Sequence, residues 1–188
     1  MGARGRAVKV AAFVVAEAPR DARVVESLIE RVAREKHGEG VTVDLVGPST
    51  GYPPCFVVWR DLPKVMKDHK VKPWHGHFGG KPRAPDGGAA ANALLLARAW
   101  FKQTGTQANL VVLQRDMDKQ PERAEGLAQA RDEGIIDASK VVRGVASPKV
   151  EAWALCAAVI DREDSELQER FDGLRAELGS DPRTISHE

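Results

Sequence analysis

The sequence predicts an α/β fold, in which a mainly parallel sheet carries helices on both faces. Short runs of β-branched and apolar residues alternate along the chain with longer stretches in which apolar residues recur at helical spacing. This alternation is typical of strand–helix–strand units, whose right-handed crossovers place helices on both sides of the sheet. Residues 110–113 are continuously apolar, as expected of a strand that is buried on both faces.

The composition favours a folded domain with a sizeable core. Of the 188 residues, 43% are hydrophobic and 29% are charged, and the formal net charge is +1. This balance gives no strong basic footprint for nucleic acid, but it leaves room for a local basic face. Cys55 and Cys156 lie in no C-x-x-C motif, and we interpret them as reduced thiols of a cytoplasmic protein. No apolar run approaches the roughly 18 residues that indicate a membrane span. We expect one domain over residues 1–188.

The first predicted unit is a strand followed by a helix. Val8–Ala16 is rich in β-branched residues and predicts the first strand. After Pro19, apolar residues recur at helical spacing until Gly38, a typical helix-ending residue. Asp21 lies where an N-cap or a first-turn acid belongs. Residues 41–46 alternate in polarity and predict a second strand, nearer an edge of the sheet.

Residues 47–88 are rich in proline and glycine and interrupt the alternation. A structureless loop of this length is unusual, so we expect either a functional insert or short elements that the pattern does not place, with a short strand over 55–59. Cationic and aromatic side chains together suit nucleic-acid contact, although a solvated loop fits the same composition. The candidate nucleic-acid-binding residues are Lys72, Trp74, His75, His77, Lys81 and Arg83.

The second half of the chain continues the alternation. Residues 89–101 predict a buried, alanine-rich helix closed by Gly105, and residues 110–114 predict the central strand. A polar helix over 120–133 and a strand over 140–145 follow. The last predicted elements are a helix from Ser147 and Pro148 to about residue 160, containing Trp153, and an amphipathic C-terminal extension at about 163–188.

Acidic residues follow three of the predicted strands. Glu17 and Asp21 follow the first, Asp116 and Asp118 follow the central one, and Glu151 lies beyond the third. Because ligands bind at the carboxyl ends of parallel strands, we expect these carboxylates to converge at one edge of the sheet. Close carboxylates repel unless a proton or a cation compensates them, and Mg²⁺ (or Mn²⁺) takes oxygen ligands. The sequence predicts a metal site made of these five acids, which requires the first and central strands to be neighbours.

Four of these five acids also have a simpler interpretation. Asp116 and Asp118 can belong to turn chemistry, and Asp21 can be a helix cap. Glu151 can complement a helix dipole without touching a ligand.

The spacing of the acids resembles a known family. Glu17 with Asp21 four residues later, and the later pair Asp116 and Asp118, are similar to the motifs of the Toprim domain of topoisomerases, primases and overcoming-lysogenization-defect nucleases. Ala18 stands where the family usually has glycine. The resemblance implies a Toprim/Rossmann-like sheet, with Glu17 as general acid/base and the aspartates as Mg²⁺ ligands. It makes Glu17 and Asp116 the expected catalytic residues.

The segment 143–155, which includes Glu151, resembles a small stand-alone branch of that family. The resemblance covers most of residues 8–160. It implies a Mg²⁺-dependent nuclease that cleaves phosphodiester bonds, with DNA favoured over RNA. Members of this branch tend to occur with bacterial ATPases in phage-defence or mobile-element settings, so an ATPase partner protein and a homo-oligomer are compatible with it. Two alternatives stay open: a non-catalytic Toprim-like adaptor subunit and a small-molecule phosphohydrolase.

Overall fold

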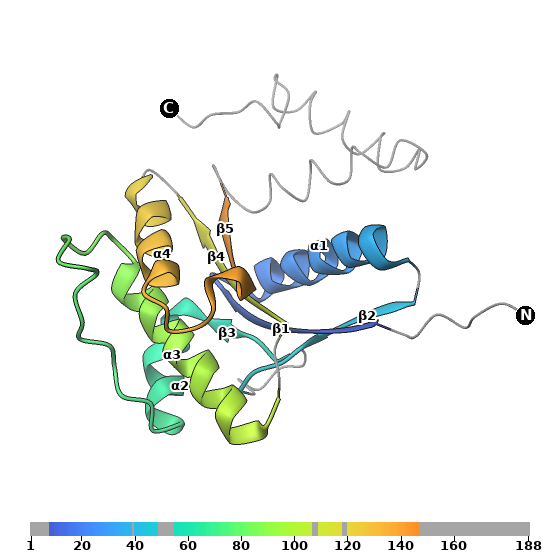
Figure 1. Cartoon of the computed structure of the whole chain (residues 1–188), viewed down its shortest axis with the longest axis horizontal. Helices are drawn as coiled ribbons and strands as arrows, with labels where there is room; N and C mark the ends of the chain where they lie inside the picture. The colour runs from blue at the N-terminus through green and yellow to red at the C-terminus, as the bar shows by residue number, and fades with distance from the viewer. Residues whose placement is uncertain (1–7, 39, 49–54, 107–108, 118–119, 147–188) are drawn as a thin grey trace, which may run out of the picture.

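The computed structural model describes residues 8–38, 40–48, 55–106, 109–117 and 120–146, and these form an α/β, Rossmann-like fold (Figure 1). The strands are β1 (Val8–Ala16), β2 (Val41–Leu45), β3 (Val57–Val58), β4 (Leu110–Asp116) and β5 (Val141–Ala146). The helices are α1 (Pro19–His37), α2 (Leu62–Asp68), α3 (Gly87–Thr104) and α4 (Glu122–Asp132), with short 3-10 turns η1 (Trp59–Asp61) and η2 (Ala138–Lys140).

The sheet is parallel, and its strands lie in the order β2-β1-β4-β5. β1 pairs with β4 from Ala12↔Leu110 to Val15↔Leu113. The two-residue strand β3 pairs with the end of β1 on the side away from β4, because Val15 also pairs with Val57. The prediction that the first and central strands are neighbours is therefore confirmed, and so is the edge position of β2.

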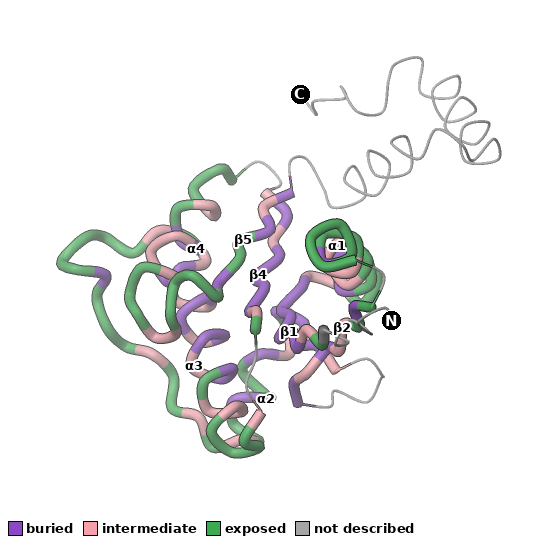
Figure 2. Tube along the Cα trace, turned by 45° about the vertical axis from the view of Figure 1, so that its right-hand side comes forward, coloured by how far each residue is buried: buried purple, intermediate pink, exposed green. Residues whose placement is uncertain are grey.

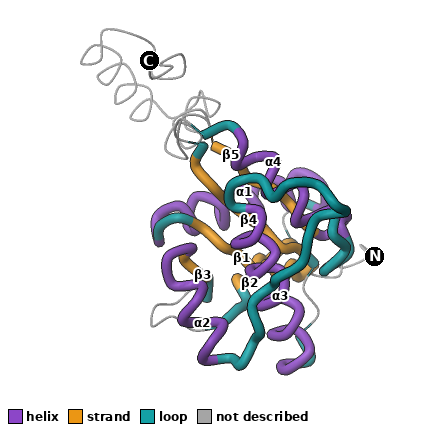
Figure 3. The backbone as a smooth tube through the Cα atoms, turned by 90° about the vertical axis from the view of Figure 1, so that its left-hand side faces the viewer, coloured by secondary structure: helices purple, strands orange, loops and turns teal. Residues whose placement is uncertain are grey.

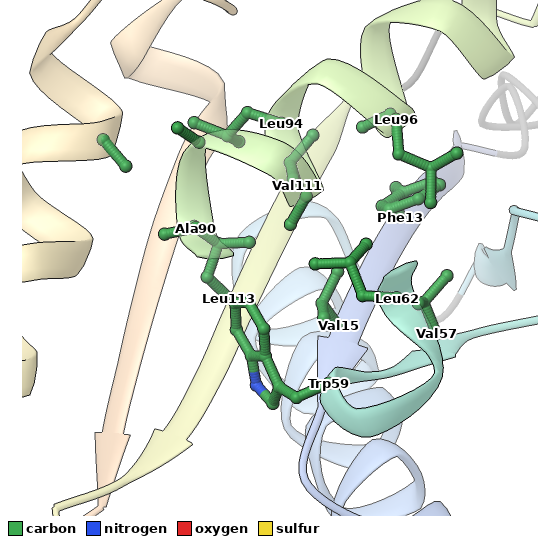
Figure 4. Close-up of a cluster of buried hydrophobic side chains, with 14 of the residues drawn as sticks. Phe13, Val15, Val57, Trp59, Leu62, Ala90, Leu94, Leu96, Val111 and Leu113 are labelled. Carbon is green, nitrogen blue, oxygen red and sulfur yellow. The ribbon is translucent and has the colours of Figure 1, made fainter. Parts of the chain in front are cut away.

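Helices cover both faces of this sheet, as the alternation of the sequence predicts. Side chains of β1 alternate between the two faces, because successive residues of a strand point to opposite sides. Phe13 and Val15 face α2 and α3, where they pack with Leu94 and Leu113 (Figure 4). Ala12 and Val14 face α1 and belong to a separate apolar cluster. β1 and β4 are buried along most of their length, whereas β2 and β5 are partly exposed, as are the outer faces of the helices (Figure 2).

The helix ends agree with the glycine signals in the sequence. Gly38 and Gly105 follow α1 and α3 with φ values of 82° and 69°, a left-handed region that glycine enters without steric cost. Two predicted elements lie outside the described residues: the helix that begins at Ser147 and contains Trp153, and the C-terminal extension over 163–188.

The proline-rich stretch over 47–88 contains short elements in its described part. Val57 and Val58 form β3, within the strand expected over 55–59, and η1 and α2 follow it. The loop between α2 and α3 then crosses the outside of the helical layer (Figure 3). Cys55 is a free, partly buried thiol, and Cys156 lies outside the described residues. In the described ranges, no helix is long and apolar enough to cross a membrane.

Candidate functional site at the ends of β1 and β4

The candidate site lies at the carboxyl edge of the sheet, where β1 and β4 end. Glu17 follows β1 directly, and Asp116 is the last residue of β4. The two strands are paired up to Val15 and Leu113, so their polar ends emerge side by side. The fold thus brings together the strand ends that carry the two expected catalytic acids.

Gln114 links these two strand ends. Its side chain is 0% exposed, so each of its polar groups needs a partner. The side-chain oxygen accepts a hydrogen bond from the Glu17 backbone N–H at 3.1 Å, and the side-chain amide donates to Asp116 Oδ1 at 3.0 Å. Its backbone carbonyl accepts a hydrogen bond from Trp59 Nε1 at 2.6 Å. One buried glutamine therefore fixes the end of β1 relative to the Asp116 carboxylate.

Two arginines approach the carboxylate of Glu17. Arg115 Nη1 lies 3.0 Å from Glu17 Oε1, and Arg123 Nη1 lies 3.8 Å from the same oxygen. This oxygen is buried, yet no described residue donates a well-directed hydrogen bond to it. The Arg115 contact is thus an ion pair by distance, without the N–H alignment of a hydrogen bond. Glu17 keeps unused acceptor capacity at the strand end.

Asp86 binds the same two arginines. Arg115 donates to it twice, from Nε to Oδ2 at 2.9 Å and from Nη2 to Oδ1 at 3.3 Å. Arg123 Nε lies 3.2 Å from Asp86 Oδ2. Glu17, Arg115, Asp86 and Arg123 therefore form a four-charge network of alternating sign. Their side chains are 15–26% exposed, so the charges interact more strongly than they would in open solvent.

The backbone of Asp86 is held in an unusual conformation. It precedes α3 with φ 61° and ψ −9°, the left-handed region, and its side chain does not cap the helix. Aspartate tolerates this region better than most residues, but the conformation still indicates that tertiary contacts hold it in place. The two arginines supply those contacts.

Among the described acids of the set, Asp116 and Asp21 are the most buried. Asp116 is 7% exposed, and its backbone carbonyl accepts a hydrogen bond from Arg123 Nη1 at 2.9 Å. Asp21 is 3% exposed and lies in the first turn of α1, where its Oδ2 accepts a hydrogen bond from the Ala18 backbone N–H at 3.0 Å. Of the two positions expected for Asp21, the structure shows the first-turn acid, because Ala18 is the N-cap.

The remaining expected metal ligands, Asp118 and Glu151, lie outside the described residues. Within the described ranges, no three His, Cys, Asp or Glu side chains lie close enough to hold a metal ion. Mg²⁺ nevertheless needs only one or two carboxylates when water and substrate phosphate complete its coordination. Glu17 and Asp116 supply two carboxylates for such a site. Glu17 Oε1 accepts no hydrogen bond from a described residue, so it is able to bind a cation.

The candidate nucleic-acid residues lie on the loop between α2 and α3. The side chains of Lys72, His75, His77, Lys81 and Arg83 are exposed. Trp74 differs, because its ring stacks on Phe78 with centroids 4.4 Å apart and its backbone N–H donates to Asn92 Oδ1 at 2.6 Å. One face of the Trp74 ring is thus covered by protein, and the residue anchors the loop to α3.

Four residues of the site were not identified from the sequence: Gln114, Arg115, Asp86 and Arg123. Gln114 carried a usable signal, because a polar residue inside a buried strand needs hydrogen-bond partners. Asp86 and Arg123 carried none, since Asp86 lies far from both arginines in the sequence and meets Arg123 only through the packing of α3 against α4.

Chemically, this edge of the sheet combines carboxylates with two rigid guanidinium groups. Arginine binds phosphate through paired N–H groups, and carboxylates bind hard cations or transfer protons. Comparison with models of protein families, with curated proteins and with solved structures finds no match.

Proposed function

We propose that the protein is a Toprim-like, Mg²⁺-dependent nuclease that cleaves phosphodiester bonds of nucleic acid, with DNA the favoured polymer, in the cytoplasm. The observation that carries this proposal is the Gln114 bridge, which fixes the end of β1, directly before Glu17, relative to the Asp116 carboxylate at the end of β4. Carboxylates at neighbouring strand ends can hold the metal ion that assists phosphoryl transfer.

In this proposal each described residue has a defined task. Glu17 would exchange a proton with the attacking water or the leaving oxygen, and Asp116 would hold the metal together with Asp21, Asp118 and Glu151, of which the last two lie outside the described residues. Mg²⁺, when bound, polarises the phosphoryl oxygens and lowers the pKa of water. Arg115 and Arg123 neutralise the phosphate charge that would otherwise be repelled by the acids. An ATPase partner and a role in defence against phage or mobile elements extend the same proposal.

The test is a cleavage assay with plasmid and oligonucleotide substrates in Mg²⁺ or Mn²⁺. We expect Glu17→Gln and Asp116→Asn each to lower the rate at least about a hundredfold, the scale of one general acid/base or metal contribution. Glu35→Gln is the matched control, because Glu35 pairs with Arg31 on the exposed side of α1. Absence of cleavage by the wild type, or cleavage that survives both site changes, contradicts the proposal.

A second function, a non-catalytic adaptor subunit, is favoured by one observation. Glu17 already has two arginines beside it, so its charge is compensated without a metal ion. An adaptor would bind neither Mg²⁺ nor Mn²⁺ at this edge of the sheet. Titration calorimetry with Mn²⁺ separates the two functions, because the nuclease requires binding that Glu17→Gln and Asp116→Asn weaken.

A further inference from the structure

A cavity of about 500 Å³ opens between α2, the chain that follows it and the start of α3. Its floor is apolar, made by Trp59, Leu62 and Met66, which are 8%, 3% and 3% exposed. Pockets of about 300–1,000 Å³ with an apolar floor and a few polar groups are the usual size and character of small-ligand sites. The floor therefore suits a flat or apolar group rather than an ion alone.

Three lysines line this cavity, and no acid does. Lys67, Lys70 and Lys72 all have exposed side chains. Lys64, also on α2, forms an ion pair with Asp68 at 3.4 Å. The three lysines that line the cavity form no ion pair with any described residue. Three uncompensated cations around an apolar floor are complementary to a ligand that carries several negative charges and an apolar ring.

Lys70 occupies a position where glycine is usual. The Lys70 N–H donates to the Lys67 carbonyl at 3.0 Å, and the Val71 N–H donates to the Met66 carbonyl at 2.8 Å. These two bonds are those of a Schellman motif, which places Lys70 at the left-handed residue, with φ 56°. The chain has lysine at this strained position, and Lys70 lines the cavity.

The cavity is in direct contact with the candidate site through Trp59. This residue lines the cavity and donates its indole N–H to Gln114, the residue that bridges Glu17 and Asp116. The Arg115 guanidinium lies over the Trp59 ring at 5.4 Å, and the same guanidinium is 3.0 Å from Glu17. A ligand seated on Trp59 is thus one side chain away from the acids.

We infer that this cavity is a nucleotide-binding subsite for a single strand of nucleic acid. One base lies on the floor formed by Trp59 and Met66, and the phosphates on either side contact Lys67, Lys70 and Lys72. A base supplies the flat apolar group, and successive phosphates supply the repeated charge that three lysines match. This inference rests on the proposed function in one respect, since it assigns the nucleic-acid strand a path beside the cleavage site.

The first experiment measures binding of a fluorescently labelled oligothymidylate by anisotropy, in EDTA so that cleavage does not occur. The test variant combines Lys67→Ala, Lys70→Gly and Lys72→Ala, with glycine chosen because it accepts the left-handed backbone. We expect at least a thirtyfold loss of affinity, and a salt dependence whose slope falls by about two because roughly 0.7 is expected for each lysine on a single strand.

The control variant changes the same number of lysines elsewhere: Lys36, Lys64 and Lys102 to alanine, all exposed and none of them lining the cavity. We expect its affinity to stay within about threefold of the wild type. Equal losses in the two triple variants would show a general charge effect and overturn the inference. Thermal unfolding of each variant shows whether the lysines merely complement the end of α2, in which case stability falls and affinity does not.

A second variant tests whether a base enters the cavity. Ala89→Leu fills the space between α2 and α3 without changing charge, because Ala89 lines the cavity. We expect about tenfold weaker binding of oligothymidylate, and unchanged binding of an abasic oligonucleotide of equal length. Equal binding of oligothymidylate by wild type and Ala89→Leu overturns the inference.

Thymidine monophosphate distinguishes the source of the nucleotide. If it binds as tightly as the oligonucleotide, the occupant is a free nucleotide, and the strand-binding inference is overturned. Failure of the proposed function is visible separately: it leaves binding dependent on the three lysines but gives no cleavage in Mg²⁺. If cleavage depends on Glu17 and Asp116 but the cavity variants bind oligothymidylate normally, the subsite inference is overturned and the proposed function stands.

Discussion

At the scale of single residues, Gln114 holds the site together. Every polar group of its fully buried side chain has a partner, and those partners are the backbone N–H of one candidate acid, Glu17, and the carboxylate of the other, Asp116. A buried polar network of this kind is stable only while every member is satisfied. The geometry of the site therefore depends on a residue that takes no part in the proposed chemistry.

Replacing Gln114 by leucine tests this dependence. The change keeps a side chain of similar volume but leaves the Glu17 N–H without its 3.1 Å acceptor and Asp116 without one donor. An unsatisfied buried polar group costs roughly 1–3 kcal/mol, so we expect the free energy of unfolding to fall by about 2–4 kcal/mol in urea denaturation. Gln103→Leu, at an exposed position of α3, is the control, with a change within about 0.5 kcal/mol. Equal effects at both positions would show that the bridge contributes nothing.

The same network shows what could be predicted from the sequence at this scale. Glu17 and Asp116 were identifiable because each follows an apolar strand, and the strand pairing confirms that their strand ends are neighbours. The pairing of Glu17 with Arg115 and Arg123 was not, because an acid beside arginines and an acid beside a metal look the same in a linear pattern. The two kinds of acid differ in their neighbours in space. Here Asp86 binds both arginines, and its position depends on tertiary packing.

At the scale of secondary-structure elements, the contact between α4 and the start of α3 positions the arginines. Gly126 lies inside α4, where glycine weakens a helix, and the sequence gives no reason for it. A Cβ atom built there would overlap the Pro85 carbonyl oxygen and approach the Gly87 nitrogen to 2.7 Å. Glycine therefore lets α4 pack directly on the backbone on both sides of Asp86, which brings Arg123 within reach of it.

We expect Gly126→Ala to lower the free energy of unfolding by about 1–3 kcal/mol, the usual effect of overpacking, although alanine favours a helix. The clash is with backbone, so it cannot be relieved by a side-chain rotation. Gly88→Ala is the matched control: its Cβ would meet only the mobile end of Arg83 at 3.0 Å, so this change should be neutral or slightly stabilising. Chemical denaturation of the two variants checks the difference, and stabilisation by Gly126→Ala would contradict the packing argument.

The turn η2 before β5 shows a cap that responds to pH. Asp137 accepts hydrogen bonds from the Ser139 hydroxyl at 2.8 Å and the Ser139 backbone N–H at 3.0 Å. These bonds, the hydroxyl first and the backbone second, hold the pKa of Asp137 below that of an ordinary aspartate, and Lys140 adds a smaller effect in the same direction. Because the folded pKa is lowered, the contribution of this cap is present above the ordinary aspartate pKa. It is lost as the pH falls through the folded pKa.

Ser139→Ala removes the hydroxyl and leaves the backbone bond. We expect the pKa of Asp137 to rise toward its ordinary value, and the loss of the cap on acidification to begin at higher pH. Titration of the Asp137 side chain by nuclear magnetic resonance measures the pKa directly. Ser27→Ala on α1 is the control and should leave it unchanged. An unchanged pKa in Ser139→Ala would show that the hydroxyl contributes nothing and would leave the backbone bond and Lys140 as the causes of the shift.

At the scale of the whole molecule, the fold class followed from periodicity, and the structure confirms it. Parallel strands buried on both faces leave continuous apolar runs, which β1 and β4 both show. The stretch over 47–88 was harder because its elements are short: β3 has two residues and α2 seven. Elements of that length have no periodicity to detect, and their stability comes from tertiary contacts such as those of Trp59, Leu62 and Met66 with the main core.

This fold places cations and candidate metal ligands at the same edge of the sheet, and the two compete. Glu17 Oε1 lies 3.0 Å from Arg115 Nη1, so a divalent cation on that oxygen would lie close to a positive guanidinium. Like charges at such a distance repel strongly in a partly buried site. If Glu17 binds the metal, Arg115 must move away or turn toward substrate phosphate, and its removal should favour the metal.

We therefore expect Arg115→Met to bind Mn²⁺ at least about tenfold more tightly than the wild type, equivalent to roughly 1.4 kcal/mol. The measurement is calorimetry, supported by thermal unfolding, because a ligand at a hundred times its Kd stabilises the folded state by about 2.7 kcal/mol. Arg98→Met, on the exposed surface of α3, is the control and should bind Mn²⁺ as the wild type does. Glu17→Gln should abolish the gain in Arg115→Met. If Mn²⁺ binds neither protein, the network is a purely structural ion-pair cluster, and the adaptor function takes the place of the nuclease.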